Sequence, residues 1–284
     1  MSMPFYVSPE QVMRDKADYA RKGVARGRSC VALQYAGGIL LVAPNASSAL
    51  HKISEIYDRI GFAAVGRYNE YESLRKAGVT YADVTGYQFD RHDVTARGIA
   101  NWYAQQLGTI FTDSNKPFEV EIVVAEVGAT PDSDQIYRIT FDGSVTDEPG
   151  FVAFGGQADQ VAAALKERFS DGMSLTEALG AALAALAPPP AAGNAASAGN
   201  GAQAELNAAQ LEVAILDRAR AHRTFRRLRG ARLEELLAES RSAASAAGSP
   251  SRDAASSASP ADEPPTGPEP PTGPAARGSD GTPQ

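Results

Sequence analysis

The sequence predicts an α+β fold in which two antiparallel sheets stack face to face between two layers of helices, a four-layer α/β/β/α sandwich. Two observations support this prediction. Pairs of short apolar runs within 28–45 and 52–66 are each joined by a tight turn, which is typical of β-hairpins and therefore of antiparallel sheets. The helical patterns come in pairs rather than singly between strands, so we expect them to cover the outer faces of the two sheets.

The first elements have clear boundary signals. The stretch Ser8-Pro9-Glu10-Gln11 combines a capping serine, a proline suited to the first helical position and a glutamine that can reach back to the cap, which predicts a helix over 8–24. The next hairpin has the runs VALQY and ILLVA on either side of Ala36-Gly37-Gly38. The second hairpin is expected to turn at Asp58-Arg59.

The remaining elements follow from apolar periodicity. Tyr68, Tyr71 and Leu74 have helical spacing, and Ser174 with Glu177 forms a capping box ahead of another helix. In chain order we expect helices over 68–77 and 93–111, strands over 119–127, 135–142 and 151–154, helices over 157–169 and 174–187, strands over 211–217 and 224–228, and a helix over 231–239.

Composition divides the chain into one folded domain and two low-complexity segments. Residues 188–204 lack large apolar side chains, so they are expected to form a flexible insert within a domain that spans 1–240. Residues 241–284 are rich in Ala, Ser, Gly and Pro and contain the repeat EPPTGP-EPPTGP. This composition predicts a disordered tail.

Charge and residue usage exclude several classes of protein. The net charge of −7 argues against general affinity for nucleic acid. The first twenty residues include several charged side chains and no apolar core segment, which argues against a standard signal peptide. No apolar run is long enough for a membrane span, so we expect a soluble cytoplasmic protein without a membrane partner. A single cysteine, Cys30, and three scattered histidines, His51, His92 and His222, predict neither a metal site nor a cofactor.

One segment supports a different hypothesis, an RNA-binding module. Residues 217–232 contain seven arginines. However, Phe225 and Leu228 are the only large apolar side chains there, so base stacking would have little surface to use. Arginines alternating with apolar positions fit the exposed edge of a sheet better.

The order of four motifs resembles the proteasome family. SPEQ…YARKG leads into VALQYAGGILLVA, followed by HKISEIYDRIGFAAVG and later by YRITFDGS. The extra N-terminal helix makes the chain similar to an α-type subunit of the bacterial, actinobacterial core particle, over about residues 3–240. The resemblance implies the fold of N-terminal nucleophile hydrolases in a non-catalytic form.

The resemblance also implies where a catalytic residue would stand. Catalytic β-type subunits begin at the first strand of the opening hairpin with a threonine whose own amino group acts as the base. Here Arg28 and Ser29 occupy that place, Pro44 replaces the acidic residue at the end of the second strand, and only the lysine is kept, as Lys52. We therefore expect no catalytic residue. The alternative function is a self-processing N-terminal nucleophile hydrolase. Separately, Ser29 and Cys30 could suggest an internal nucleophile, although a lone cysteine is commonly a small buried residue.

For Lys52 the resemblance implies a role in docking. Alpha subunits keep a lysine in the pocket between neighbouring subunits, where it receives the C-terminal carboxylate of a hexameric AAA ATPase activator. Gly27 and Gly66 match small residues that line this pocket. The alternative is that Lys52 is an ordinary solvated lysine at the start of a strand.

The resemblance gives the N-terminus a role as a gate. Residues 1–7 of seven subunits would converge on the axis of a heptameric ring that caps two catalytic β rings, although the segment departs from the Tyr-Asp-Arg gate pattern of archaeal and eukaryotic subunits. The alternative is a frayed terminus. The implied substrates are proteins of broad sequence, tagged in actinobacteria with a small ubiquitin-like protein (pupylated). The expected gate residues are Pro4, Phe5, Tyr6, Val7, Ser8 and Pro9.

Overall fold

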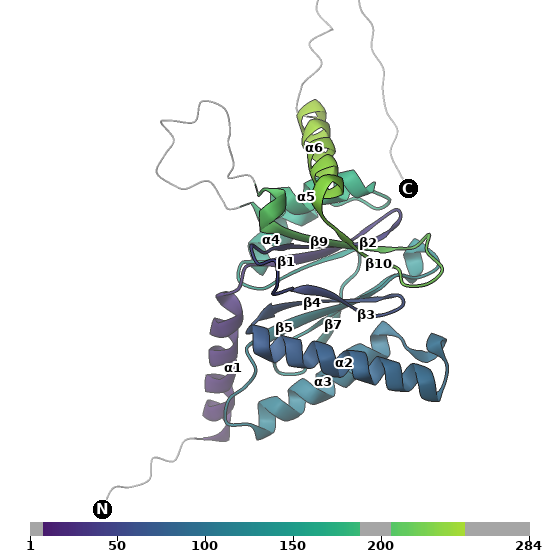
Figure 1. Ribbon diagram of the computed structural model, residues 1–284. Helices are drawn as coiled ribbons and strands as arrows, with labels where there is room; N and C mark the ends of the chain where they lie inside the picture. Colours follow the sequence, from purple (N-terminus) through teal and green to yellow (C-terminus); the bar gives the residue numbers. More distant parts are fainter. Residues whose placement is uncertain (1–7, 188–205, 248–284) are drawn as a thin grey trace, which may run out of the picture. The chain divides into compact units, whose positions relative to one another are not determined.

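The computed structural model describes residues 8–187 and 206–247, which belong to a single compact unit. Figure 1 shows the predicted four layers, with two stacked sheets between two layers of helices. This confirms the predicted fold class. The predicted insert 188–204 and the gate residues Pro4, Phe5, Tyr6 and Val7 lie outside the described residues.

Within the described residues, the strands form two five-stranded sheets in which every neighbouring pair is antiparallel. The first sheet has the order β10 (Phe225–Leu228), β9 (Leu211–Asp217), β2 (Gly38–Pro44), β1 (Cys30–Tyr35) and β8 (Phe151–Phe154). The second has the order β3 (Ile53–Tyr57), β4 (Ile60–Gly66), β5 (Val120–Glu126), β6 (Gln135–Ile139) and β7 (Val145–Asp147).

Two groups of helices cover the outer faces of the sheets (Figure 1). On the first sheet, α4 packs on β8 and α5 on β1 and β2, while α6 packs on α5. On the second sheet, α2 packs on β3 and β4, and α3 packs on β5 and β6. Their bounds are α2 (Tyr68–Gln88), α3 (Ala96–Asp113), α4 (Ala158–Lys166), α5 (Leu175–Leu186) and α6 (Gly230–Ala247). Short 3₁₀ turns are η1 (Arg91–Asp93), η2 (Pro131–Ser133) and η3 (Ala208–Gln210).

Strand alternation explains why both faces of the sheets are buried. In β1, Val31 and Leu33 pack in the cluster beneath α5 and α6, whereas Cys30 and Ala32 pack between the two sheets. The layer between the sheets uses many small side chains. Gly61 lies there against Leu41, so the sheets approach closely.

Helix α1 (Pro9–Ala25) leads into the first strand. Ser8 Oγ accepts a hydrogen bond from the Gln11 N–H at 3.3 Å, and Pro9 is the first helical residue. The helix packs on β4 and β5 of the second sheet and ends at Ala25, and four residues separate this end from Cys30, where β1 of the first sheet begins. Residues 26–29 therefore cross from one sheet to the other.

Two helices extend further than the sequence predicts. We expected a helix over 68–77, but α2 continues to Gln88 through Gly78 and Gly86. At these positions a Cβ would collide with the hydroxyls of Tyr103 and Tyr57, so the glycines serve close packing inside the helix rather than its end.

Helix α6 corrects the predicted end of the domain. It runs to Ala247, beyond the expected helix over 231–239 and into the predicted disordered tail 241–284. The added turns are rich in alanine and serine, and Ser240 is buried close to Gly180 of α5. A lack of large side chains suggests disorder, but alanine has a high helix propensity, which favours these added turns.

Candidate docking site around Lys52

Lys52 stands at the end of the loop that carries the chain from β2 in the first sheet to β3 in the second. Its side chain is partly buried, and its Nζ donates a hydrogen bond to the Arg28 carbonyl at 3.2 Å. Among the described residues, the ion pairs do not include Lys52. The ammonium therefore lies at the crossing between the sheets without a carboxylate partner in this part of the chain.

The structure brings the predicted Gly27 and Gly66 close to this lysine. Gly27 directly precedes Arg28, and its Cα faces Val65 and the Gly66 N–H. A Cβ at Gly27 would collide with Val65. Gly66 has a φ of 120°, and a Cβ there would collide with the Glu119 carbonyl. Both glycines are thus required by the close contact between residues 26–29 and the end of β4, whether or not a partner enters.

A pocket of about 530 Å³ opens beside Gly27. Its lining includes Arg26, Arg28, Pro44 and Gln157. Neither Lys52 nor Gly66 lines it. The lysine therefore meets the Gly27–Arg28 segment through the Arg28 carbonyl and is not part of this pocket.

Ser29 and Cys30 are held in structural roles. Ser29 is 7% exposed, and its Oγ accepts a hydrogen bond from the Gln157 N–H at 2.9 Å. Cys30 is fully buried, and this burial raises the pKa of its thiol to about 11, although the nearby Lys52 charge acts in the opposite direction. A thiol with this pKa stays protonated at neutral pH. The hypothesis of an internal nucleophile at either residue has no support here.

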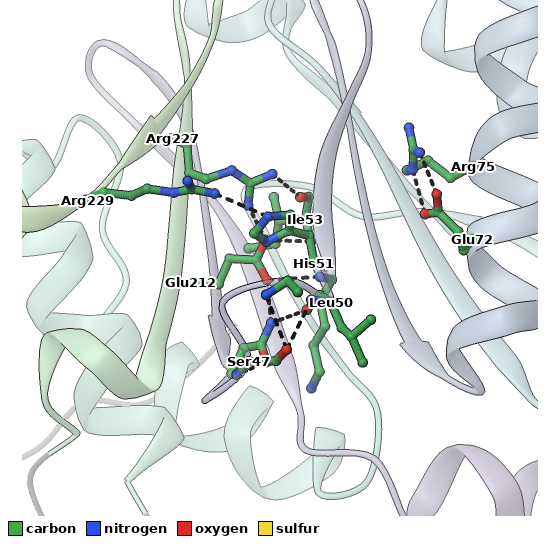
Figure 2. A network of polar contacts seen from close by, with 12 residues as sticks. Ser47, Leu50, His51, Ile53, Glu72, Arg75, Glu212, Arg227 and Arg229 are labelled. Atoms are coloured by element: carbon green, nitrogen blue, oxygen red, sulfur yellow. Dashed lines mark hydrogen bonds and ion pairs between the residues drawn. The ribbon is translucent and has the colours of Figure 1, made fainter.

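Figure 2 shows a buried polar network around Glu212, which sequence reasoning missed. Glu212 lies on β9, is 6% exposed, and accepts hydrogen bonds from Asn45 Nδ2 at 2.9 Å and from the backbone N–H of Lys52 at 2.9 Å. It also accepts from the Ile53 N–H at 3.3 Å and pairs with the Arg227 guanidinium. The available signal was a single charged residue in the otherwise apolar stretch LEVAIL.

His51 belongs to the same network (Figure 2), and its side chain is more exposed than that of Glu212. Its Nδ1 is 3.3 Å from Glu212 Oε1, and its Nε2 is 3.3 Å from Arg229 Nη2. Partial burial and the Arg227 charge lower the pKa of His51 below its usual value, against the opposing influence of Glu212. The imidazole is therefore neutral at neutral pH.

Carboxylates neutralise most of the arginine-rich segment 217–232. Five of its seven arginines form ion pairs with acidic side chains. The pairs are Arg218–Asp134, Arg223–Glu55, Arg226–Asp217, Arg227–Glu212 and Arg232–Glu235. The segment thus offers little unpaired positive charge to phosphate groups, which removes the basis of the RNA-binding hypothesis.

In the described part of the chain, no three His, Cys, Asp or Glu side chains gather in a way that could hold a metal ion. None of the helices in the ranges 8–187 and 206–247 has the length and apolarity to cross a bilayer.

Comparison with known proteins gives consistent matches. A family model described as proteasome subunit matches residues 24–203. The chain is 63% identical to a proteasome subunit alpha of Streptosporangium roseum over 94% of its own length and 99% of that protein. It is 64% identical to a proteasome subunit alpha of Thermobifida fusca, over 84% of this chain and 92% of that protein. It is 66% identical to a proteasome subunit alpha of Thermomonospora curvata, over 84% of this chain and 99% of that protein.

Proposed function

The chain belongs to the proteasome family as an α subunit, and we propose that it forms the outer ring of the core particle, gates substrate entry and docks an ATPase activator. Alpha subunits are non-catalytic components, and the catalytic activity belongs to β subunits. The residues Arg28, Ser29 and Cys30 at the start of β1 agree with this division, because none is a threonine.

The proposed assembly is a heptameric α ring that caps two catalytic β rings in the cytoplasm and admits pupylated proteins of broad sequence. Residues 1–7 would form the gate at the ring axis. Two features support a gate at this end. Pro4, Phe5, Tyr6 and Val7 are mainly apolar, and the capped first turn at Ser8 and Pro9 fixes where the segment leaves the folded unit.

One observation carries the docking part of the proposal: the partly buried Lys52 ammonium has a carbonyl partner and no carboxylate partner among the described residues. An ammonium offers three N–H donors, and the Arg28 carbonyl takes one. A C-terminal carboxylate of an activator would satisfy the others through charge-assisted hydrogen bonds. Gly27 and Gly66 would add no side chain beside Lys52.

The test is activator-stimulated degradation by particles that carry Lys52→Ala. Removing one partner of a partly desolvated ion pair costs about 2–5 kcal/mol per site, and simultaneous engagement of several tails compounds the loss. We expect stimulation of casein degradation to be abolished while hydrolysis of a short peptide is unchanged.

Two controls accompany this measurement. Lys16→Ala removes another lysine whose Nζ binds backbone carbonyls, those of Phe111 and Thr112, and should leave stimulation intact. A variant without residues 1–7 should degrade casein without the activator, in the presence or absence of Lys52→Ala. Equal activator binding by wild-type and Lys52→Ala particles would show that Lys52 is only a solvated lysine.

A further inference from the structure

The position of Lys52 depends on a loop with little apolar anchoring. The chain leaves β2 at Pro44 and enters β3 at Ile53, and most side chains between them are exposed. Such a loop needs polar contacts to hold one conformation. The loop supplies some itself, since Asn45 Nδ2 donates to the Leu50 carbonyl at 2.7 Å.

Glu212 supplies three further contacts from the neighbouring strand β9. One oxygen of its carboxylate, Oε2, accepts from both Asn45 at the start of the loop and the Lys52 N–H at its end. The other oxygen, Oε1, accepts from the Ile53 N–H. A single side chain therefore holds both ends of the loop, and two of its three donors there, the N–H groups of Lys52 and Ile53, are at or beside the docking lysine.

Arg227 on β10 compensates the charge of this buried carboxylate. Its guanidinium binds Glu212 through Nη1 and donates to the Ile53 carbonyl through Nη2 at 2.7 Å. A buried carboxylate is tolerated only when it is paired and hydrogen-bonded, and here both conditions are met. Glu212 and Arg227 thus join β9 and β10 of the first sheet to the beginning of β3 in the second, next to Lys52.

We propose that Glu212 is a positioning residue that fixes the Lys52 backbone so that its ammonium is held ready for an incoming carboxylate. This inference rests on the proposed docking role of Lys52. Glu212 itself makes no contact with the activator. Its contribution is preorganisation, because a loop that is already ordered loses less conformational freedom on binding.

The test compares Glu212→Gln, Lys52→Ala and the double variant in assembled α/β particles. Glutamine keeps the size of the side chain. However, its NH₂ group would be a donor at the place where Oε2 now accepts from the Asn45 side chain and from the Lys52 N–H. The readouts are the activator concentration that gives half-maximal stimulation and the maximal stimulated rate. Glu121→Gln is the matched control, because Glu121 is also a buried carboxylate with an arginine partner, Arg138, and a backbone donor, Gly155.

We expect Glu212→Gln to raise the half-maximal activator concentration roughly three- to tenfold, the range for loss of one buried hydrogen bond, with the maximal rate kept. Because Lys52→Ala should abolish stimulation, the double variant is compared with it by equilibrium binding of the activator. It should bind the activator no more weakly than Lys52→Ala alone, since Glu212 acts through Lys52. Glu121→Gln should leave the half-maximal concentration unchanged.

Several outcomes would overturn the inference. One is that Glu212→Gln and Glu121→Gln change the half-maximal activator concentration equally. Another is that the double variant binds the activator more weakly than Lys52→Ala alone. If Lys52→Ala itself leaves activator binding unchanged, the proposed function fails and the positioning role fails with it. Should Glu212→Gln particles not assemble, Arg227→Lys, which keeps the charge but loses the planar fork, is measured under the same criteria.

Discussion

At the scale of single residues, burial decides the chemistry of the two reactive groups at the crossing between the sheets. Cys30 is fully buried and Lys52 is only partly buried, although they are close enough for the lysine charge to affect the thiol. The thiol is consequently protonated and inaccessible. The ammonium keeps contact with solvent and can meet a partner.

We predict that Cys30 resists alkylation in the native protein. Iodoacetamide reacts with the thiolate, and a thiol with a pKa of about 11 has little thiolate at pH 8. Mass spectrometry should show almost no modification within an hour in buffer and complete modification in concentrated urea. As the accessible control, a Cys30→Ala, Ser48→Cys variant should react quickly without urea, because Ser48 is exposed. Fast labelling of native Cys30 would show that the region opens.

The sequence could predict some of these residues and not others. The positions of Lys52, Gly27 and Gly66 followed from a resemblance in local motifs. Glu212 could not be found in this way, because the Lys52 and Ile53 N–H groups that it binds are about 160 residues away and meet it only in the folded chain, where β9 pairs with β2. A charged residue inside an apolar strand signals a buried partner but does not identify it.

At the scale of elements, the ends of helices were harder to predict than their presence. Gly78 and Gly86 suggest a break in α2. Instead, their lack of a side chain leaves room for the hydroxyl groups of tyrosines on α3 and β3. In α6 the buried positions Leu233, Leu236, Leu237 and Ser240 follow helical spacing, and the last of these is a serine that an apolar pattern does not count. Helix boundaries here depend on packing partners more than on local composition.

Leu236 tests how firmly α6 is anchored. The side chain is 2% exposed and packs in the cluster beneath α5 and α6. Leu236→Ala should lower the free energy of unfolding by about 2–5 kcal/mol, because it leaves a cavity in a packed layer. Urea unfolding followed by circular dichroism measures this. Leu50→Ala, at a residue that is 47% exposed, serves as the control and should change stability little. A loss below 0.5 kcal/mol, roughly the value typical of surface sites, would contradict tight packing of α6.

At the scale of the whole molecule, the sheets combine distant parts of the chain. The two hairpins could be predicted locally because each has a short turn between apolar runs. The first sheet, however, also pairs β2 with β9 and β1 with β8, and the second pairs β4 with β5. No local pattern specifies these pairings. They follow from the four-layer arrangement, which the order of hairpins and helix pairs predicted and the structure confirms.

The C-terminal limit of the folded unit gives the last prediction. Residues 249–284 contain no Val, Ile, Leu, Met, Phe, Tyr, Trp or Cys, so they have little apolar surface to bury. A chain ending at residue 248 keeps all the described contacts of α6. It should therefore have the same melting temperature as the full chain in differential scanning calorimetry, and it should assemble equally well.

The informative comparison is a chain that ends at residue 229. This variant loses α6 with Leu233, Leu236 and Leu237, and exposes the face of α5 that they cover. We expect a large fall in melting temperature or a failure to fold. A similar fall for the chain ending at 248 would mean that residues 249–284 stabilise the folded unit after all. Equal melting temperatures for all three chains would instead show that α6 is not part of the cooperative core, in contradiction to its buried leucines.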